Sequence, residues 1–373
     1  MWHLVGLLAI PCAIAGIAAY KFKATITLQE FALMLGLACT VAVGGFFLAR
    51  WGAMQDIEHW NGRITAKDHG SQKCCHCRQV CDTCPSKDSQ GRTTTTSCNC
   101  REVCSHSSDY YWSLEVSTGD DVSIARCESN PFNVPSAWTK AYVGEPASVP
   151  HTYTNYLLAD PDSLLMSVAD ESLLARVPAA IPQVHSFYKV DKVVSDGVRI
   201  PPGWQQGLLE MNADLGKGKQ VDVILVVTDN PDPTYAQAVE AKWLYGPKNA
   251  VIIVVGVPFD SPTFEWVRVV SISKVESLKV ALRDGLKGKR LDDPEGGVAF
   301  IRQAIMSKFE RTPLAEWEYL ASAATPSTWV LVLLYILVTG GTIGLAVWMH
   351  REDVFARFGR RRSSGFTFGR RRW

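Results

Sequence analysis

Three long apolar stretches constrain this chain most strongly. Phe31 to Ala49 has no charged residue over 19 positions, and Trp329 to Met349 has none over 21. About 20 apolar residues in a helix span the hydrocarbon core of a bilayer. Leu4 to Tyr20 is shorter and contains Pro11; we expect an uncleaved first span, with a cleaved signal peptide as the alternative. The sequence therefore predicts an integral membrane protein with three transmembrane helices.

Basic residues beside these stretches predict the orientation, because cytoplasmic loops carry an excess of Lys and Arg. Lys21 and Lys23 lie between the first two spans, and the last 23 residues hold eight arginines against Glu352 and Asp353. Both segments are therefore expected in the cytoplasm. The N-terminus and residues 51–327 are expected outside it, in the periplasm or an equivalent compartment, with the spans in the inner (plasma) membrane.

The basic tail after the third span contains the sequence FGRRR twice. Polybasic segments next to a membrane attract anionic lipid by about 1 kcal/mol per basic residue. Nucleic-acid binding is the less favoured use of such a tail. The residues expected to bind anionic lipid are Arg360, Arg361, Arg362, Arg370, Arg371 and Arg372.

Cysteine is concentrated in a short part of the predicted ectodomain. Eight cysteines fall between residues 74 and 104, His76 and His106 lie among them, and Cys127 follows. The intervening sequence DSQGRTTTTS has almost no apolar residues. A hydrophobic core therefore cannot stabilise this segment by itself, and covalent or metal cross-links are expected.

The nature of these cross-links is open from the sequence. Disulfides are favoured by the compartment, because thiols oxidise outside the cytoplasm. Zinc is the alternative, since closely spaced thiolates can share a tetrahedral ion, and a mixture of both is the third possibility. A redox-active Cys-x-x-Cys motif is disfavoured because nothing helical follows Cys84. The nine ectodomain cysteines are an odd number, so one is free, joins two chains or some bind metal. The residues that would hold zinc if they are not disulfide-bonded are Cys74, Cys77, Cys81, Cys84, Cys98, Cys100, Cys104 and His106.

Residues 109–127 alternate apolar and polar side chains around a Gly-Asp turn. This pattern is typical of a β-hairpin. Cys127 lies at the end of the second expected strand, where it could tie that strand back to the cysteine cluster.

Residues 155–312 have the pattern of an α/β domain. Val221 to Ile272 contains two short β-branched runs separated by a helix pattern and followed by a third run, as in a βαβ unit with both faces covered. Before it, Asp160 to Leu174 and Gly203 to Leu215 indicate helices, and Ser186 to Val194 indicates a strand. The stripes expected to be buried are Trp204, Leu208, Met211 and Leu215; Tyr235, Ala238, Val239 and Trp243; Leu278, Leu282 and Leu286; and Val298, Ile301, Ile305 and Phe309.

Three pieces of this domain carry a family resemblance: VILVVTDN (Val223 to Asn230), AKWLYGPKNAVIIVV (Ala241 to Val255) and the strand around Trp266 to Val270. In order and pattern they resemble the TPM-domain family of membrane-tethered extracytoplasmic proteins. The resemblance implies an acid phosphatase or an assembly factor for membrane complexes. The chain departs from the family where SISKVESLK replaces a Gly-rich acidic stretch. The whole layout is also similar to membrane proteins of bacteria and their phages that have no assigned activity.

Acidic residues after the first strand of the βαβ unit are candidates for a second metal site. Ligands bind at the C-terminal ends of strands in open α/β sheets, and carboxylates suit Ca²⁺ or Mg²⁺. Asp229 and Asp232 occupy this position, although Asp232 is equally explained as a helix cap. No nucleophile elbow, phosphate-binding loop or zinc-protease motif is present, which disfavours an enzyme.

The predicted fold class is α/β, a TPM-like open sheet covered by helices, with a small Cys-rich β module before it and three transmembrane helices. We expect an interaction or assembly module whose partner is an extracytoplasmic protein or a second copy of the chain; a TPM-type metal-dependent phosphatase is the alternative. The expected segments are transmembrane helices at 4–20 and 31–49, a juxtamembrane stalk at 51–73, a Cys/His-rich module at 74–127, an irregular connector at 128–154, the α/β domain at 155–312, a linker at 313–328, a transmembrane helix at 329–349 and a basic cytoplasmic tail at 350–373.

Overall fold

The computed structural model describes residues 2–22, 26–87, 93–159, 170–244, 246–273 and 275–352. The six tail arginines expected to bind lipid, and most of the helix expected from Asp160, lie outside the described residues. The chain forms two compact units. Unit 1 comprises Met1–Gln55, Thr154–Leu164 and Leu314–Trp373, and unit 2 comprises Asp56–Tyr153 and Leu165–Pro313.

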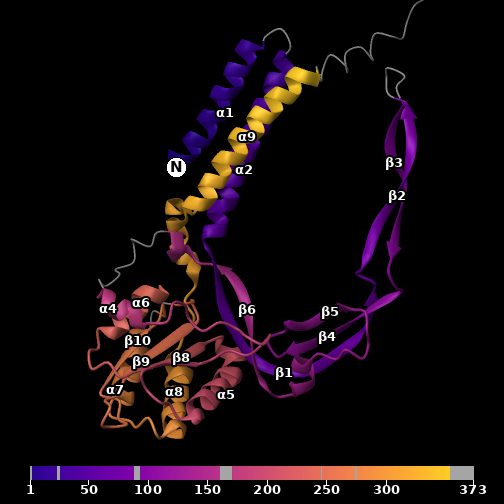
Figure 1. Cartoon of the computed structure of the whole chain (residues 1–373). Coiled ribbons are helices and arrows are strands. Elements are labelled where there is room, and N and C mark those ends of the chain that lie inside the picture. Colours follow the sequence, from indigo (N-terminus) through magenta and orange to yellow (C-terminus); the bar gives the residue numbers. More distant parts are fainter. Residues whose placement is uncertain are drawn as a thin grey trace, which may run out of the picture. The chain divides into compact units, whose positions relative to one another are not determined.

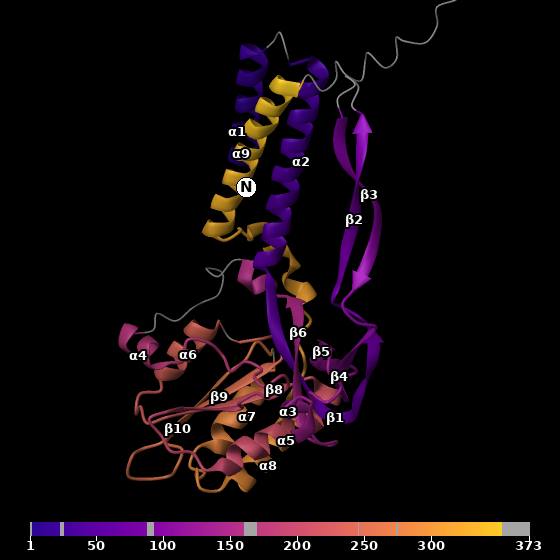
Figure 2. The same ribbon diagram turned by 45° about the vertical axis from the view of Figure 1, so that its right-hand side comes forward.

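Unit 1 is a bundle of three long helices, α1 (Trp2–Lys21), α2 (Leu28–Ala53) and α9 (Thr328–Glu352), which lie side by side in both views (Figures 1 and 2). Each helix is long and apolar enough to cross a membrane. The 3-10 helices η1 (Tyr156–Ala159) and η3 (Leu314–Ala323) belong to the same unit. The three predicted spans are thus confirmed as apolar helices of membrane-spanning length. One end of the bundle buries Leu7, Ala42, Phe46, Leu331, Leu334 and Val338.

Unit 2 contains a four-stranded sheet with the order β5-β4-β1-β6. Its strands are β1 (Gln55–Lys73), β4 (Ser108–Val116), β5 (Asp121–Glu128) and β6 (Pro146–Thr154). The predicted hairpin is confirmed, because β4 and β5 pair antiparallel around the turn that contains Gly119. One core of this sheet consists of Ile64, Trp112, Leu114, Val116, Val122, Ile124, Ala141, Ala147 and Tyr188.

Two expected segments differ from the structure. The juxtamembrane stalk at 51–73 is instead the end of α2 followed by β1, which lies between β4 and β6. The irregular connector at 128–154 contains the short helix α3 (Ser136–Lys140) and the whole of a regular strand, β6. The sequence of β1 concealed its role because several of its buried side chains are polar, and apolar alternation is the signal by which a strand is recognised.

The second sheet has the order β10-β9-β8-β7. Its strands are β7 (Val193–Asp196), β8 (Asp222–Thr228), β9 (Ala250–Gly256) and β10 (Trp266–Val270). The first three run parallel, and β10 is antiparallel to β9. Every residue of β8 and β9 is buried, as expected for strands covered on both faces. The strand predicted at 186–194 was wrong in extent, because only its last two residues join the sheet.

Helices cover both faces of this sheet. One face packs against α5 (Pro202–Lys219), α7 (Glu276–Leu286) and α8 (Pro294–Lys308), and the other against α6 (Tyr235–Trp243) and α4 (Glu171–Arg176). Successive residues of a strand point to opposite faces, so alternate residues of β8 enter the two cores. The predicted buried stripes are confirmed, with Val298 only partly buried.

Polar side chains of β1 join the two sheets in a buried network. The Asp222 carboxylate lies 3.3 Å from His59 Nδ1, accepts a 3.1 Å hydrogen bond from Asn61 Nδ2, and pairs with the Lys192 ammonium group. The Lys192 and Asp222 side chains have no exposed surface. Burial raises the pKa of Asp222, but the charge of Lys192 and the His59 imidazole outweigh burial and hold it below its ordinary value. Burial lowers the pKa of Lys192, and Asp222 opposes this effect.

A second buried carboxylate extends the network. Glu58 pairs with Arg311 and lies 3.6 Å from Lys248 Nζ and 3.4 Å from His151 Nδ1, while Trp60 Nε1 donates to it at 2.9 Å. Buried charges are stable only when they are paired. The expected Cys/His-rich module and α/β domain are therefore parts of one compact unit.

Candidate metal centre at the base of the disulfide-bonded ribbon

Unit 2 contains a long two-stranded ribbon in addition to its two four-stranded sheets. Strands β2 (Cys77–Lys87) and β3 (Thr93–Cys104) pair antiparallel and form a sheet of their own, visible as the long arm in Figures 1 and 2. None of the ribbon side chains whose exposure is described is buried. A hydrophobic core therefore does not hold this part of the ribbon together.

Disulfides take the place of that core. Eight of the nine ectodomain cysteines are paired, and Cys74 is free and buried. A cross-link that closes a loop of about 15 residues stabilises a fold by about 3 kcal/mol in the chain-entropy model. The pairs across the ribbon are Cys77–Cys104, Cys81–Cys100 and Cys84–Cys98, and Cys75–Cys127 ties the ribbon to β5.

The expected zinc ligands are divided by this pairing. Six of the eight residues, all cysteines of the ribbon, have their sulfur atoms in disulfides, and a disulfide sulfur is not a thiolate ligand. Cys74 and His106 remain. The tie predicted for Cys127 is present, with Cys75 as its partner.

The base of the ribbon brings four possible metal ligands together. In an antiparallel hairpin the start of the first strand lies beside the end of the second strand. Residues just before β2 therefore lie close to residues just after β3. Cys74 and His76 come from the first side, and His106 and Asp109 come from the second. One ligand atom from each of these four residues lies within 4.8 Å of all the others. This set is called the base cluster below.

Asp109 is the centre of the base cluster. Its carboxylate is fully buried, accepts a 2.6 Å hydrogen bond from the Cys75 backbone N–H, and lies 3.2 Å from His76 Nδ1. Its other oxygen contacts His106 Nε2. Burial raises the pKa of Asp109, but the Cys75 N–H and the two imidazoles outweigh burial and hold it below the ordinary value. The carboxylate is therefore an anion that faces two imidazole nitrogens.

Ser105 fixes the orientation of the His106 ring. Its hydroxyl lies 2.9 Å from His106 Nδ1, and its backbone N–H donates to the His76 carbonyl at 3.2 Å. A hydroxyl can either donate or accept, so it serves both tautomers of the ring. With the proton on Nδ1, the lone pair of Nε2 points toward Asp109, which is the arrangement of a metal-bound histidine.

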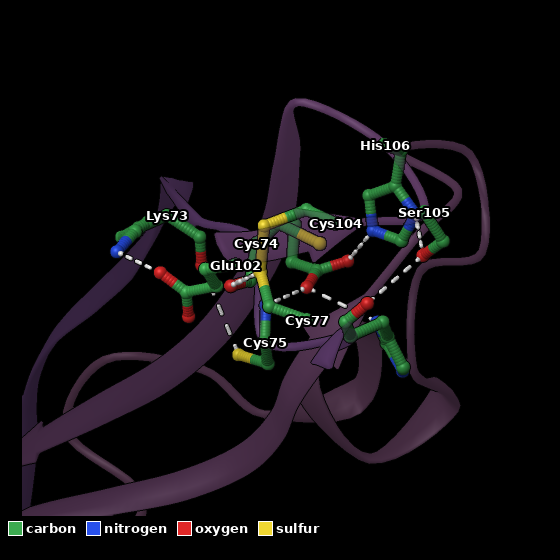
Figure 3. The surroundings of a disulfide bond; sticks show 10 residues. Lys73, Cys74, Cys75, Cys77, Glu102, Cys104, Ser105 and His106 are labelled. Carbon is green, nitrogen blue, oxygen red and sulfur yellow. Dashed lines mark hydrogen bonds and ion pairs between the residues drawn. A yellow bond between two sulfur atoms is a disulfide. The ribbon is translucent and has the colours of Figure 1, made fainter. Parts of the chain in front are cut away.

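Cys74 lies beside a disulfide at the same place. Its sulfur and those of Cys77 and Cys104 all lie within 4.8 Å of one another. Figure 3 shows Cys74 and the Cys77–Cys104 pair gathered beside Ser105 and His106. The base cluster therefore combines one thiol, two imidazoles and one carboxylate next to a disulfide, a set of groups that could hold a metal ion.

Two members of the base cluster were missed as ligands from the sequence. His76 stood among the cysteines, and Asp109 was seen only as the first residue of the hairpin. The available signal was the pairing of Cys74-x-His76 with His106-x2-Asp109 at the two ends of one cysteine-rich segment. That signal becomes informative only when the segment between them is known to be a hairpin.

The acidic residues proposed for Ca²⁺ or Mg²⁺ have other partners. Asp229 lies at the end of β8, as predicted, and its carboxylate pairs with the Arg176 guanidinium. Asp232 accepts a 2.8 Å hydrogen bond from the Thr234 backbone N–H just before α6. Asp232 thus orders the start of the helix, and the Asp229 charge is balanced by an arginine.

Comparison with protein-family models, with curated proteins and with solved structures finds no match for this chain. The comparisons therefore do not identify a TPM domain.

Proposed function

We propose that this integral membrane protein presents its disulfide-bonded unit outside the cytoplasm, where the β2–β3 ribbon binds a partner protein as an interaction or assembly module. The single observation that carries this proposal is a disulfide-bonded ribbon whose described side chains are not buried in its own chain. Three cross-strand disulfides fix an arm that contributes nothing to the hydrophobic cores of unit 2. We therefore propose that the ribbon serves to bind another molecule.

Rigidity favours binding because a surface that is already ordered loses little entropy when it meets a partner. The ribbon also offers two outer strand edges, since β2 and β3 pair only with each other among the described strands. Exposed backbone N–H and C=O groups on such edges accept a further strand from another protein. The charged residues Arg78, Asp82, Arg101 and Glu102 are exposed on the ribbon and suit a polar rim.

A photo-crosslinking amino acid placed at Val103 is expected to give one discrete adduct in cells that normally make the protein. Val103 is 39% exposed on the ribbon. The matched control position is Phe259, which is fully exposed in a loop of the α/β part. The mass of the adduct distinguishes a partner protein from a second copy of the chain. Equal adducts from both positions would argue against binding through the ribbon.

Shortening the ribbon gives an independent test. Replacing residues 79–102 by a four-residue turn removes Cys81, Cys84, Cys98 and Cys100 in complete pairs and keeps the Cys77–Cys104 disulfide. Because these residues lie outside the cores, the free energy of unfolding of unit 2, measured by urea denaturation, is expected to stay within about 0.5 kcal/mol of wild type. The partner should no longer co-purify. Retention of the partner by a folded, shortened protein would contradict the proposal.

The orientation is a separate part of the proposal. Four disulfides in unit 2 support an oxidising compartment for residues 51–327, and the basic tail supports a cytoplasmic C-terminus. A fluorescent protein that matures only in the cytoplasm, fused after Trp373, is expected to fluoresce. The same fusion inserted in the Phe259 loop should be dark. The reverse pattern would show the opposite orientation.

A TPM-type metal-dependent phosphatase gains no support from the described residues. Its candidate Asp229 is paired with Arg176, and Asp232 is engaged by the backbone. We therefore propose the interaction role alone.

A further inference from the structure

We propose that the base cluster, Cys74, His76, His106 and Asp109, binds one Zn²⁺ ion, and that the bound ion keeps the Cys74 thiolate from attacking the neighbouring Cys77–Cys104 disulfide. Zinc binding here is independent of partner binding by the ribbon. Either property can be lost in an experiment while the other remains.

The spacing of the donor atoms suits a tetrahedral ion. Zinc holds sulfur, nitrogen and oxygen ligands at about 2.0–2.3 Å, which places neighbouring donors about 3.3–3.8 Å apart. The donor atoms of the base cluster lie within 4.8 Å of one another, and Asp109 and His76 are already 3.2 Å apart. The four donors are therefore already close to the spacing of a tetrahedral site.

The kinds of donor select the ion. Ca²⁺ and Mg²⁺ prefer oxygen ligands alone, and the softest ions prefer sulfur ligands alone. One sulfur, two nitrogens and one oxygen from four side chains match a borderline ion such as Zn²⁺ in a structural site. The surroundings also fit, because the Cys75 N–H holds the Asp109 carboxylate and the Ser105 hydroxyl orients the His106 ring. Such outer hydrogen bonds are typical of metal sites.

The disulfide beside Cys74 means that a bound ion would also affect thiol–disulfide exchange. A Cys74 thiolate can form a bond to Cys77 Sγ while the Cys77–Cys104 bond breaks, and the electron pair leaves on Cys104 Sγ. Cys104 then takes up the proton that Cys74 lost, so the exchange needs no oxidant or reductant. The three sulfurs lie within 4.8 Å of one another, which makes this exchange local. A thiolate that is bound to zinc is occupied, and the ion thereby preserves the disulfide at the base of the ribbon.

The site is tested on the full-length protein, purified in detergent without a histidine tag. We expect one Zn²⁺ per chain by elemental analysis, and with Co²⁺ a thiolate-to-metal charge-transfer band. Cys74→Ser should abolish the band, and His106→Gln should weaken metal binding at least about 100-fold, since even outer-shell changes cost 10–100-fold. The control His185→Gln, which alters a histidine paired with Asp191 elsewhere in unit 2, should bind metal like wild type.

The protective role is tested by disulfide mapping of the wild-type protein. After incubation at pH 8 with EDTA and acid quenching, peptides in which Cys74 is joined to Cys77 or Cys104 should be roughly tenfold more abundant than after incubation with Zn²⁺. Asp109→Asn keeps the thiol but weakens the site, so it should show the exchange at zinc concentrations that protect wild type.

Three outcomes overturn the proposal. If the wild-type protein contains no zinc and shows no charge-transfer band with Co²⁺, the site does not exist. Unchanged binding in both Cys74→Ser and His106→Gln places the metal elsewhere. Identical disulfide maps with EDTA and with Zn²⁺ remove the protective role. The cobalt spectrum and the EDTA map use the unaltered chain, so they decide the matter even where a variant fails to fold.

Discussion

Lys192→Met is expected to lower the free energy of unfolding of unit 2 by about 3–5 kcal/mol, the usual cost of leaving one buried charge without its partner. Lys192 has no exposed surface, and its ammonium group is the cation that pairs with Asp222 beneath β1. Methionine fills a similar volume, so the loss reports the charge and not a cavity. Urea denaturation followed by the fluorescence of the buried residues Trp204, Trp243 and Trp266 measures this change.

Lys189→Met is the matched control for that variant. The Lys189 side chain is 47% exposed, and its ammonium group lies 3.2 Å from Glu145. An ion pair at the surface contributes about 0–1 kcal/mol. Adding Asp222→Asn to Lys192→Met should recover much of the lost stability, because the uncompensated carboxylate is removed. Equal effects of Lys189→Met and Lys192→Met would contradict the buried network.

Lowering the pH should reduce the difference in the free energy of unfolding between wild type and Lys192→Met. The folded-state pKa of Asp222 lies below its ordinary value of 3.8, so its stabilising contribution is complete above that pH and is lost as the pH falls toward the folded-state pKa. A protonated Asp222 needs no cation. The two proteins should therefore converge in stability as the pH falls below about 4, and urea midpoints measured from pH 7 downward check this.

Gly216→Ala is expected to lower the free energy of unfolding of unit 2 by about 2–3 kcal/mol through overpacking. A Cβ atom on Gly216 would lie 1.7 Å from the backbone carbonyl oxygen of Asn61, so α5 and β1 would have to separate. The same separation disturbs Asn61, whose side chain donates to the Val221 carbonyl and to Asp222. The effect of one methyl group would thus spread into the buried network.

Gly218→Ala separates this contact from the effect of helix propensity. Gly218 lies two residues later in α5, and an added Cβ there meets nothing within 4 Å. Alanine in an unstrained helical position stabilises by about 0.4–1 kcal/mol. The two substitutions should therefore change the urea midpoint in opposite directions. A stabilising Gly216→Ala would show that β1 does not pack on α5 as described.

The helices and central strands followed from the sequence because their patterns are local. Leu278, Leu282 and Leu286 repeat at helical spacing, and all three are fully buried. The β-branched runs of β8 and β9 likewise predicted strands that are covered on both faces, and every residue of both strands is buried. The role of β1 was not predictable in this way. Glu58 and His59 are buried by partners more than 160 positions away in the chain, and no local pattern encodes such a partner.

The candidate metal centre was predictable only in part. A count of nine ectodomain cysteines required one exception to pairing, but it could not say that Cys74 was the exception. Eight cysteines alone allow 105 pairings. Asp109 belongs to the base cluster because β2 and β3 bring it back to His76, and that depends on the length and register of the ribbon.

The four disulfides are completely nested, and this shapes how the protein is made. Their sequence separations are 14, 19, 27 and 52 residues, and each longer loop encloses all the shorter ones. Once the innermost pair has closed, each later bond needs to gather only the few residues that flank the bond before it, and short closures cost less entropy. During synthesis, however, the first cysteines of the cluster emerge before any of their partners exist. Cys75 is among the first cysteines to be synthesised, and its partner Cys127 is the last. Formation of the correct disulfides therefore requires that the first cysteines stay reduced until the second half of the cluster has been synthesised.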